Sequence, residues 1–374
     1  MLKVGGAAVV ILGAGAAGWA LTRAPKRARV PWRVAGESFG DPRLDALAYA
    51  VLAPNPHNMQ PWRIRLDGED GFYLYADLSR MLPETDPPNR QITIGFGAFL
   101  ELFRQAAAEG GARADATYFP EGEGPRLDER PIAFVRLIAD PATPRDPLFD
   151  GVLDRRTNRA PFEAGGLPAD VFEAIKAASV DGVFADATAD PERVAELKVL
   201  AREAWRIEWE LPRTRAETIK VTRVGKEEIE AQPWGIALSG PIMEAADLAG
   251  VLTPESMNAP GKAGYEQTLS FYENAIDSAA AFLWATTATN SRRDQLEAGR
   301  AWVRMQLAAN AAGLAFHPLS QPLQEFPEMR GPYERAHALL GSGGGIVQML
   351  ARLGYAKVPP PAPREPLEAK LIEA

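Results

Sequence analysis

The chain has 374 residues, 46% of them hydrophobic and 24% charged, which is an ordinary globular composition long enough to bury a large core. Its formal net charge of −8 argues against a general nucleic-acid binder, which needs a surplus of Lys and Arg on one surface. The absence of cysteine excludes disulfides and thiol chemistry, and the three histidines are too scattered to predict a metal site.

The N-terminal 30 residues combine an apolar run at 4–21 with a basic stretch at 22–30. Residues 13–18 read G-A-G-A-A-G and fit a dinucleotide-binding fingerprint, but Pro25 interrupts the helix that should follow. A targeting or anchor segment over residues 1–30 is the simpler interpretation. We therefore expect an exported, periplasmic or membrane-anchored protein that meets the membrane only through this segment, with a cytoplasmic location as the alternative.

The next elements are a helix at 41–52, which opens with Asp and Pro, and a loop at 53–62 that reads A-P-N-P-H-N-M-Q-P-W. Proline fixes φ and pushes the preceding residue out of the helical region, so we expect a stiff, extended loop whose backbone amides cannot pair locally. Rigid loops often carry function, and this one offers side-chain amides as donors and acceptors. They belong to Asn55, Asn58 and Gln60.

Alternating and helical patterns follow in an order typical of an α+β half. Strands are predicted at 62–66 and 71–76, a core helix at 91–110, and two further strands at 114–119 and 131–138. Residues 141–147 form a linker, after which the pattern restarts.

The restart contains D-R-R-T-N-R-A-P-F at 154–162. Three arginines within five residues beside the hydroxyl of Thr157 can surround a phosphate, because guanidinium groups match phosphate oxygens bidentately. The alternative is a solvated basic turn before the helix predicted at 171–179. The three arginines are Arg155, Arg156 and Arg159.

The rest of the chain is predicted to be largely helical. Helices are expected at 191–209, 268–289, 294–313 and 333–340. Residues 211–262 are interrupted by five prolines, and we interpret them as a lid over a site or, alternatively, as a surface insertion. The helix ending at Gly313 leads into a loop that contains Pro318, Leu319, Ser320 and Gln321.

Several of these motifs resemble those of the nitroreductase-like flavoproteins. The loop at 53–62 resembles their P-S-x-x-N-x-Q-P-W, residues 155–162 resemble their R-R-S-x-R-x-F, and the tail at 359–368 resembles their P-x-x-R-x-P-L-E. The first residues, M-L-K-V-G-G, resemble the end of a twin-arginine (Tat) export signal that lacks its arginines. The chain looks closest to the Acg-related group, in which fused dimers occur.

The resemblance implies bound FMN, with the arginine motif at 155–162 and the C-terminal Arg364 on its phosphate and a backbone amide of Ser320 or Gln321 on flavin N5. The implied cofactor-binding residues are Pro54, Asn55, Pro56, Asn58, Gln60, Arg155, Arg156, Thr157, Arg159, Pro318, Leu319, Ser320, Gln321 and Arg364. The resemblance names no proton-transfer residue.

The motifs are divided between two parts of the chain. Only residues 31–147 contain the proline-rich loop, and only residues 148–374 contain the arginine motif and the C-terminal arm. We expect an α+β, nitroreductase-like fold in two tandem halves, a monomer with an internal pseudo-dimer and one remaining site. The implied function is an FMN-dependent oxidoreductase that reduces nitro compounds, quinones or similar acceptors, with NAD(P)H as a possible donor. The alternative is an FMN-storing or redox-sensing flavoprotein whose lid excludes nicotinamide.

Overall fold

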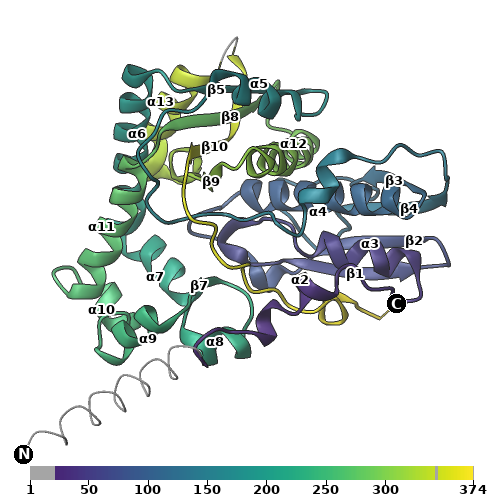
Figure 1. Ribbon diagram of the computed structural model, residues 1–374, viewed down its shortest axis with the longest axis horizontal. Helices are drawn as coiled ribbons and strands as arrows, with labels where there is room; N and C mark the ends of the chain where they lie inside the picture. The colour runs from purple at the N-terminus through teal and green to yellow at the C-terminus, as the bar shows by residue number, and fades with distance from the viewer. Residues whose placement is uncertain (1–21, 342–343, 374) are drawn as a thin grey trace, which may run out of the picture.

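The computed structural model describes residues 22–341 and 344–373, so most of the predicted N-terminal targeting segment lies outside the described residues. The first half contains a four-stranded antiparallel sheet in the order β1-β2-β4-β3, with helices packed against it (Figure 1). These elements confirm the strands and helices predicted before residue 140. Their bounds are α2 (Pro31–Val34), α3 (Pro42–Ala50), β1 (Trp62–Asp67), β2 (Gly71–Ala76), α4 (Arg90–Glu109), β3 (Ala112–Tyr118) and β4 (Ala133–Ala139).

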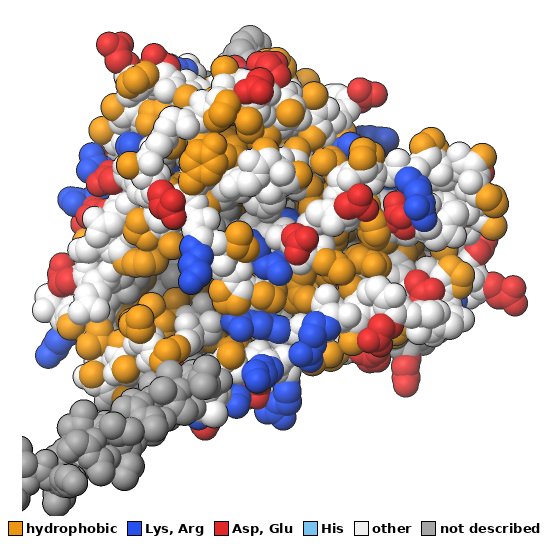
Figure 2. All heavy atoms as spheres, viewed as in Figure 1, with side chains coloured by type: hydrophobic (Ala, Val, Ile, Leu, Met, Phe, Trp, Pro, Cys, Tyr) orange, Lys and Arg blue, Asp and Glu red, His pale blue; other side chains and the backbone are white. Residues whose placement is uncertain are grey.

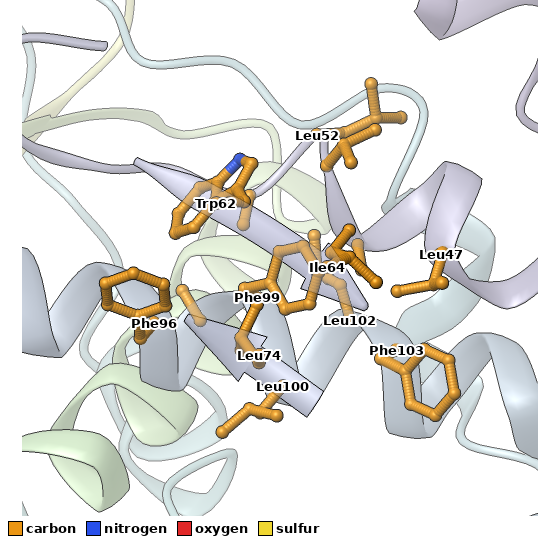
Figure 3. Close-up of a cluster of buried hydrophobic side chains, with 14 of the residues drawn as sticks. Leu47, Leu52, Trp62, Ile64, Leu74, Phe96, Phe99, Leu100, Leu102 and Phe103 are labelled. Atoms are coloured by element: carbon orange, nitrogen blue, oxygen red, sulfur yellow. The ribbon is translucent and has the colours of Figure 1, made fainter. Parts of the chain in front are cut away.

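Aromatic side chains of α4 fill the core of this half (Figure 3). Trp62, at the start of β1, is fully buried, and its ring centroid lies 5.2 Å from Phe96 in an edge-to-face arrangement and 5.0 Å from Phe99. Such pairs add to the free energy of burying large apolar rings. The residue that ends the proline-rich loop is therefore anchored in the core.

The second half has its own four-stranded antiparallel sheet, in the order β5-β8-β10-β9 (Figure 1). The two sheets, each with its helices, confirm the α+β architecture in two halves. The bounds are α5 (Ala169–Ala177), β5 (Val183–Thr188), α6 (Pro191–Glu210), α11 (Ala263–Asp277), β8 (Ala281–Thr287), α12 (Arg292–Ala311), β9 (Ala315–Pro318), α13 (Arg330–Leu340) and β10 (Ile346–Gly354).

The helix predicted at 268–289 is wrong in its second part. Helix α11 ends at Asp277, and the chain continues as the central strand β8. All seven residues of β8 are buried, because neighbouring strands flank it and helices cover it. A strand buried on both faces lacks the apolar–polar alternation of an exposed strand, so its sequence cannot be distinguished from a buried helix by periodicity.

The two halves meet through α4 and α12, which pack closely together. A Cβ atom added at Gly299 would lie 1.9 Å from the carbonyl oxygen of Ile94, and one at Gly97 would lie 2.0 Å from that of Leu296. No side chain fits at these distances, so glycine at both positions allows the backbones to approach. The internal pseudo-dimer is thus joined by one long helix from each half.

Residues 212–258 form the insertion predicted as a lid, and six short elements, three of which begin at proline, confirm its segmented character. It packs against the first half as well as the second: the Gly235 amide donates to the Asn58 carbonyl at 3.0 Å, and Glu217 accepts from the amides of Glu84 and Thr85 at 2.9 Å. The bounds are α7 (Pro212–Lys220), β6 (Thr222–Val224), α8 (Gly225–Ala231), β7 (Ile236–Leu238), α9 (Pro241–Leu248) and α10 (Pro254–Asn258).

After β10, the C-terminal arm runs from the second half across to the first (Figure 1). Leu371 forms a parallel bridge with Ile64 of β1, and the Ile372 amide donates to the Ile64 carbonyl at 2.8 Å. The arm thereby brings Arg364 beside the proline-rich loop. Within the residues described, no helix is long and apolar enough to cross a membrane.

Candidate functional site

The proline-rich loop is a tight turn that packs against α4 at Gly95. His57, Asn58 and Gln60 have φ values of 46°, 57° and 50°, in the left-handed region that non-glycine residues seldom adopt. The Asn58 amide donates to the Asn55 carbonyl at 3.1 Å. The prediction of an extended loop without local pairing is therefore wrong, because the left-handed residues fold the chain back far enough for backbone bonds to form.

The side-chain amides of this loop bind other parts of the protein. Asn55 Oδ1 accepts from the Gln60 amide at 2.8 Å, which closes the turn. Asn58 Nδ2 donates to the Pro363 carbonyl of the C-terminal arm at 3.1 Å, and Gln60 Nε2 donates to the Pro233 carbonyl of the insertion at 2.8 Å. These bonds hold the loop rigidly between the arm and the insertion, so that its prolines Pro54 and Pro56 remain half-buried at the edge of the site.

Arginines from distant parts of the sequence converge on the same loop. Arg155 Nη2 and Arg364 Nη2 both donate to the Leu52 carbonyl, at 3.0 and 2.9 Å, and Arg364 Nη1 donates to Asn58 Oδ1 at 2.6 Å. Arg156 lies beside them, its guanidinium carbon 4.9 Å from the centroid of the Trp32 ring. The structure therefore brings together the loop, the arginine motif and the C-terminal arginine.

This arginine cluster (Arg155, Arg156 and Arg364) has no acidic partner: no carboxylate in the described residues forms an ion pair with it. The Nε atom of each of its arginines is buried without an acceptor. Burial, and then the neighbouring arginines, lower the pKa of Arg364 well below its usual value; burial, and then Arg156, lower that of Arg155 to about 9. Buried cations without counter-ions are costly, so an anion would stabilise this cluster.

Arg159 also belongs to this neighbourhood but keeps solvent-exposed surface, and it makes no hydrogen bond or ion pair with any described residue. The protein around it lowers its pKa by desolvation. Burial, and then the charge of Arg159, lower the pKa of His57 to about 4, so this loop histidine is neutral near pH 7. Arg159 is thus an accessible cation beside the proline-rich loop. On the face of the molecule drawn in Figure 2, several Lys and Arg side chains gather near the middle.

The loop after β9 contains the remaining predicted site residues. The Leu319 amide is used by the sheet, donating to the Leu350 carbonyl at 2.8 Å. By contrast, the amides of Ser320 and Gln321 have no acceptor among the described residues. Pro318 ends β9, and Gln321 Nε2 donates to the Tyr272 hydroxyl at 3.2 Å. Within the described part of the chain, these two amides are the backbone donors of this loop that remain free to bind a ligand.

Thr157 is held through its hydroxyl, which accepts from Gln306 Nε2 of α12 at 3.2 Å. Gln306 Oε1 in turn accepts from Arg155 Nη1 at 3.1 Å, so α12 orients the arginine motif. Thr157 is half-buried and faces this network.

The sequence patterns did not indicate three residues near Arg159. Tyr272 stacks on Trp205 with ring centroids 4.3 Å apart and meets His317 edge-to-face at 5.5 Å. Buried Arg352 donates from Nε to His317 Nδ1 at 2.9 Å, so that nitrogen is unprotonated. Tyr272 falls within a run read only as an apolar helix face, and no motif distinguishes it. The predicted site residues therefore form one region, which these side chains complete.

No family model matches the chain. Among curated proteins it is 28% identical over 333 residues to a Mycobacterium tuberculosis protein named provisionally as an NAD(P)H nitroreductase, covering 86% of this chain and 88% of that one. It is 36% identical over 125 residues to the Acg protein of the same organism, which carries the same provisional name; that match covers 31% of this chain and 34% of Acg.

Solved structures give weaker similarities. A nitroreductase with bound FMN from Bacteroides fragilis is 16% identical, with 57% of this chain and 89% of that one covered and a TM-score of 0.32. The nitroreductase NfnB from Mycobacterium smegmatis, solved with NADPH, is 18% identical, with 58% and 92% covered and a TM-score of 0.35. The similarity rests on the sequence relatives, one of which matches over most of its length: the chain is similar to nitroreductase-like proteins of the Acg group.

Proposed function

We propose that this protein is an FMN-dependent oxidoreductase of the nitroreductase type, which reduces nitroaromatic compounds, quinones or similar electron-poor acceptors with NAD(P)H as the electron donor. The observation that carries the proposal is the buried arginine cluster without a carboxylate, assembled from both halves beside the proline-rich loop. The printed names of the mycobacterial relatives, and the FMN and NADPH in the structures of nitroreductases, agree with it.

The residues present fit FMN. The unpartnered Nε groups of the arginine cluster would bind a phosphate, and the free amides of Ser320 and Gln321 would bind polar atoms of the ring. The proline-rich loop, made rigid by its own hydrogen bonds, would form one wall. When bound, the flavin supplies the redox chemistry, and the protein binds it, orients it and tunes its electrostatics.

The first experiment is the visible absorption spectrum of the purified protein, followed by release and identification of any bound chromophore. One FMN per monomeric chain is expected, because the motifs of only one site are present. A colourless protein that also fails to bind added FMN would refute the proposal.

Steady-state oxidation of NADPH then tests the reaction. Rapid turnover with a nitroaromatic or quinone acceptor is expected, in ping-pong steps. A flavin that dithionite reduces but NAD(P)H does not would instead favour storage or redox sensing, with residues 212–258 closing the site.

Arg159 provides a test that does not disturb the fold, since its side chain has no partner in the described residues. A cation here would favour the more negative redox form of the ring. Replacing Arg159 by Ala is therefore expected to lower the midpoint potential of bound FMN by roughly 30 mV or more, or to release the cofactor. Arg159→Lys, which keeps the charge, should retain most of the potential. Full occupancy with an unchanged potential in Arg159→Ala would contradict this role.

We also propose that the N-terminal segment predicted at 1–30 directs export or anchors the protein at a membrane through its apolar run, while its last residues, from Arg27 on, pack against the folded protein. The apolar run at 4–21 and the basic stretch after it support this proposal. Mass spectrometry of the N-terminus in a native extract tests it, and an intact residue 1 would argue against cleavage.

A further inference from the structure

The segment at 23–34 lies across the arginine cluster, between the C-terminal arm and the insertion. The Ala28 carbonyl accepts from the Arg364 amide at 2.8 Å, and Trp32 Nε1 donates to the Ala362 carbonyl at 2.8 Å. On the other side, Arg27 forms an ion pair with Glu230 of α8 at 2.9 Å. These contacts fix the segment although it contains only short helical turns, so its side chains hold defined positions beside the cluster.

Trp32 presents its ring to all three arginines of the cluster. The guanidinium carbons lie 4.9 Å (Arg156), 5.4 Å (Arg364) and 5.6 Å (Arg155) from the ring centroid, and Trp32 itself is only 6% exposed. The electron-rich face of an indole attracts cations and so offsets part of their mutual repulsion. It does so without neutralising them, which leaves their charge available to a ligand.

A second group of arginines, at the contact between the two halves, has a carboxylate partner. Arg104, Arg300 and Arg304, at the contact between α4 and α12, all pair with the buried carboxylate of Glu101 at 2.6–3.1 Å. In that group, which joins the two halves, a buried carboxylate neutralises the arginines. By contrast, the three arginines of the cluster share an indole and have no carboxylate. This arrangement suits a site that binds an anion.

Arg29 adds a fourth guanidinium to this group. Its Nη2 donates to Ser239 Oγ at 3.2 Å, and its Nε is buried without an acceptor, as in the arginines of the cluster. The geometry places Arg29 beside the cluster, because the carbonyl of the preceding residue, Ala28, accepts from the Arg364 amide at 2.8 Å. In agreement, burial, and then the charge of Arg156, lower the pKa of Arg29. No carboxylate in the described residues forms an ion pair with Arg29.

We propose that the N-terminal segment completes the phosphate site: Arg29 binds the phosphomonoester dianion of the flavin directly, and Trp32 holds Arg155, Arg156 and Arg364 in place around it. This inference rests on the proposed function. It assigns a binding role to residues that precede the first sheet and lie outside all the motifs shared with nitroreductases. It also means that the bound phosphate ties this segment to the arm and the insertion.

The experiment compares FMN with riboflavin, which differs from it only by the phosphate. Dissociation constants are measured by flavin fluorescence for the wild-type full-length chain after removal of the cofactor, and for Arg29→Gln. The expected result is a loss of about tenfold or more in FMN affinity, the effect of one charge-assisted hydrogen bond, with riboflavin affinity unchanged. An unchanged ratio of FMN to riboflavin affinity would overturn the role of Arg29.

Arg33→Gln is the matched control for Arg29→Gln. Arg33 is an exposed arginine of the same segment, next to Trp32 in α2. The control variant should leave both affinities at wild-type values. Trp32→Leu supplies a second measurement: it should lower FMN affinity and, in the flavin-free protein, reduce the thermal stabilisation by inorganic phosphate, since the arginines lose the indole that holds them in place. Equal stabilisation by phosphate in Trp32→Leu and wild type would overturn the role of Trp32. If the wild type binds neither flavin, the proposed function itself fails.

Discussion

Replacing Arg364 by Gln is expected to lower FMN affinity by about a hundredfold, more than any other single change in the arginine cluster. Arg364 is 3% exposed and holds the Leu52 and Ala53 carbonyls with Nη2 and Asn58 Oδ1 with Nη1, which leaves Nε for a ligand. The variant removes a charge-assisted bond to the phosphate and loosens the loop beside it; together these effects amount to about 3 kcal/mol. Equilibrium titration followed by fluorescence measures the affinity.

Arg80→Gln controls for the structural part of this effect. Arg80 also joins the proline-rich loop to the arm, through the Met59 carbonyl at 3.0 Å and Glu365 at 2.9 Å, but it pairs with a carboxylate and lies outside the arginine cluster. It should change FMN and riboflavin affinities by similar, smaller factors. If Arg364→Gln also weakened both flavins equally, Arg364 would support the loop without binding the phosphate.

Replacing Glu101 by Gln should lower the free energy of unfolding by about 3–5 kcal/mol, because it leaves buried cations without their main counter-ion. Glu101 is fully buried on α4 and pairs with Arg300 and Arg304 of α12 as well as with Arg104. The change thus weakens the contact between the two halves. Chemical denaturation measures the difference, and Glu297→Gln is the control. Glu297 pairs with Arg300 at 2.9 Å near the surface, so its loss should cost less than about 1 kcal/mol.

The Glu101 effect should depend on pH. Burial opposes ionisation of this carboxyl, but hydrogen bonds and the charges of Arg104 and Arg300 outweigh it and lower its pKa to about 2. A lowered pKa means that the pair contributes its full stability above the unfolded value of roughly 4.5 and loses it as the pH falls toward 2. The difference between wild type and Glu101→Gln should therefore be constant at neutral pH and shrink below about pH 4.5. A constant difference down to pH 3 would contradict this account.

Local sequence patterns were sufficient for most elements of the first half. Helix α4 is recognised by its 3.6-residue apolar period, and β1 and β2 by their alternation, because each of these elements has its own hydrophobic pattern. The division into two halves also followed from the sequence, since the loop and the arginine motif occur once each, on different sides of a linker. The candidate cofactor and its residues came from the resemblance of short motifs, such as the proline-rich loop and the arginine motif, to those of nitroreductase-like flavoproteins.

The tertiary structure decided what depends on contacts between distant residues. Strand β8 is a strand because neighbours on both sides pair with it, which its continuous apolar sequence does not reveal. The tight turn at His57 forms because contacts from the arm and the insertion, such as those to Asn58, hold its left-handed residues in place. Trp32 and Arg29 join the arginine cluster only through folding, more than 100 residues from its nearest arginine in the chain. Sequence spacing predicts which groups a short motif presents, whereas the charges and rings that surround them are set by packing.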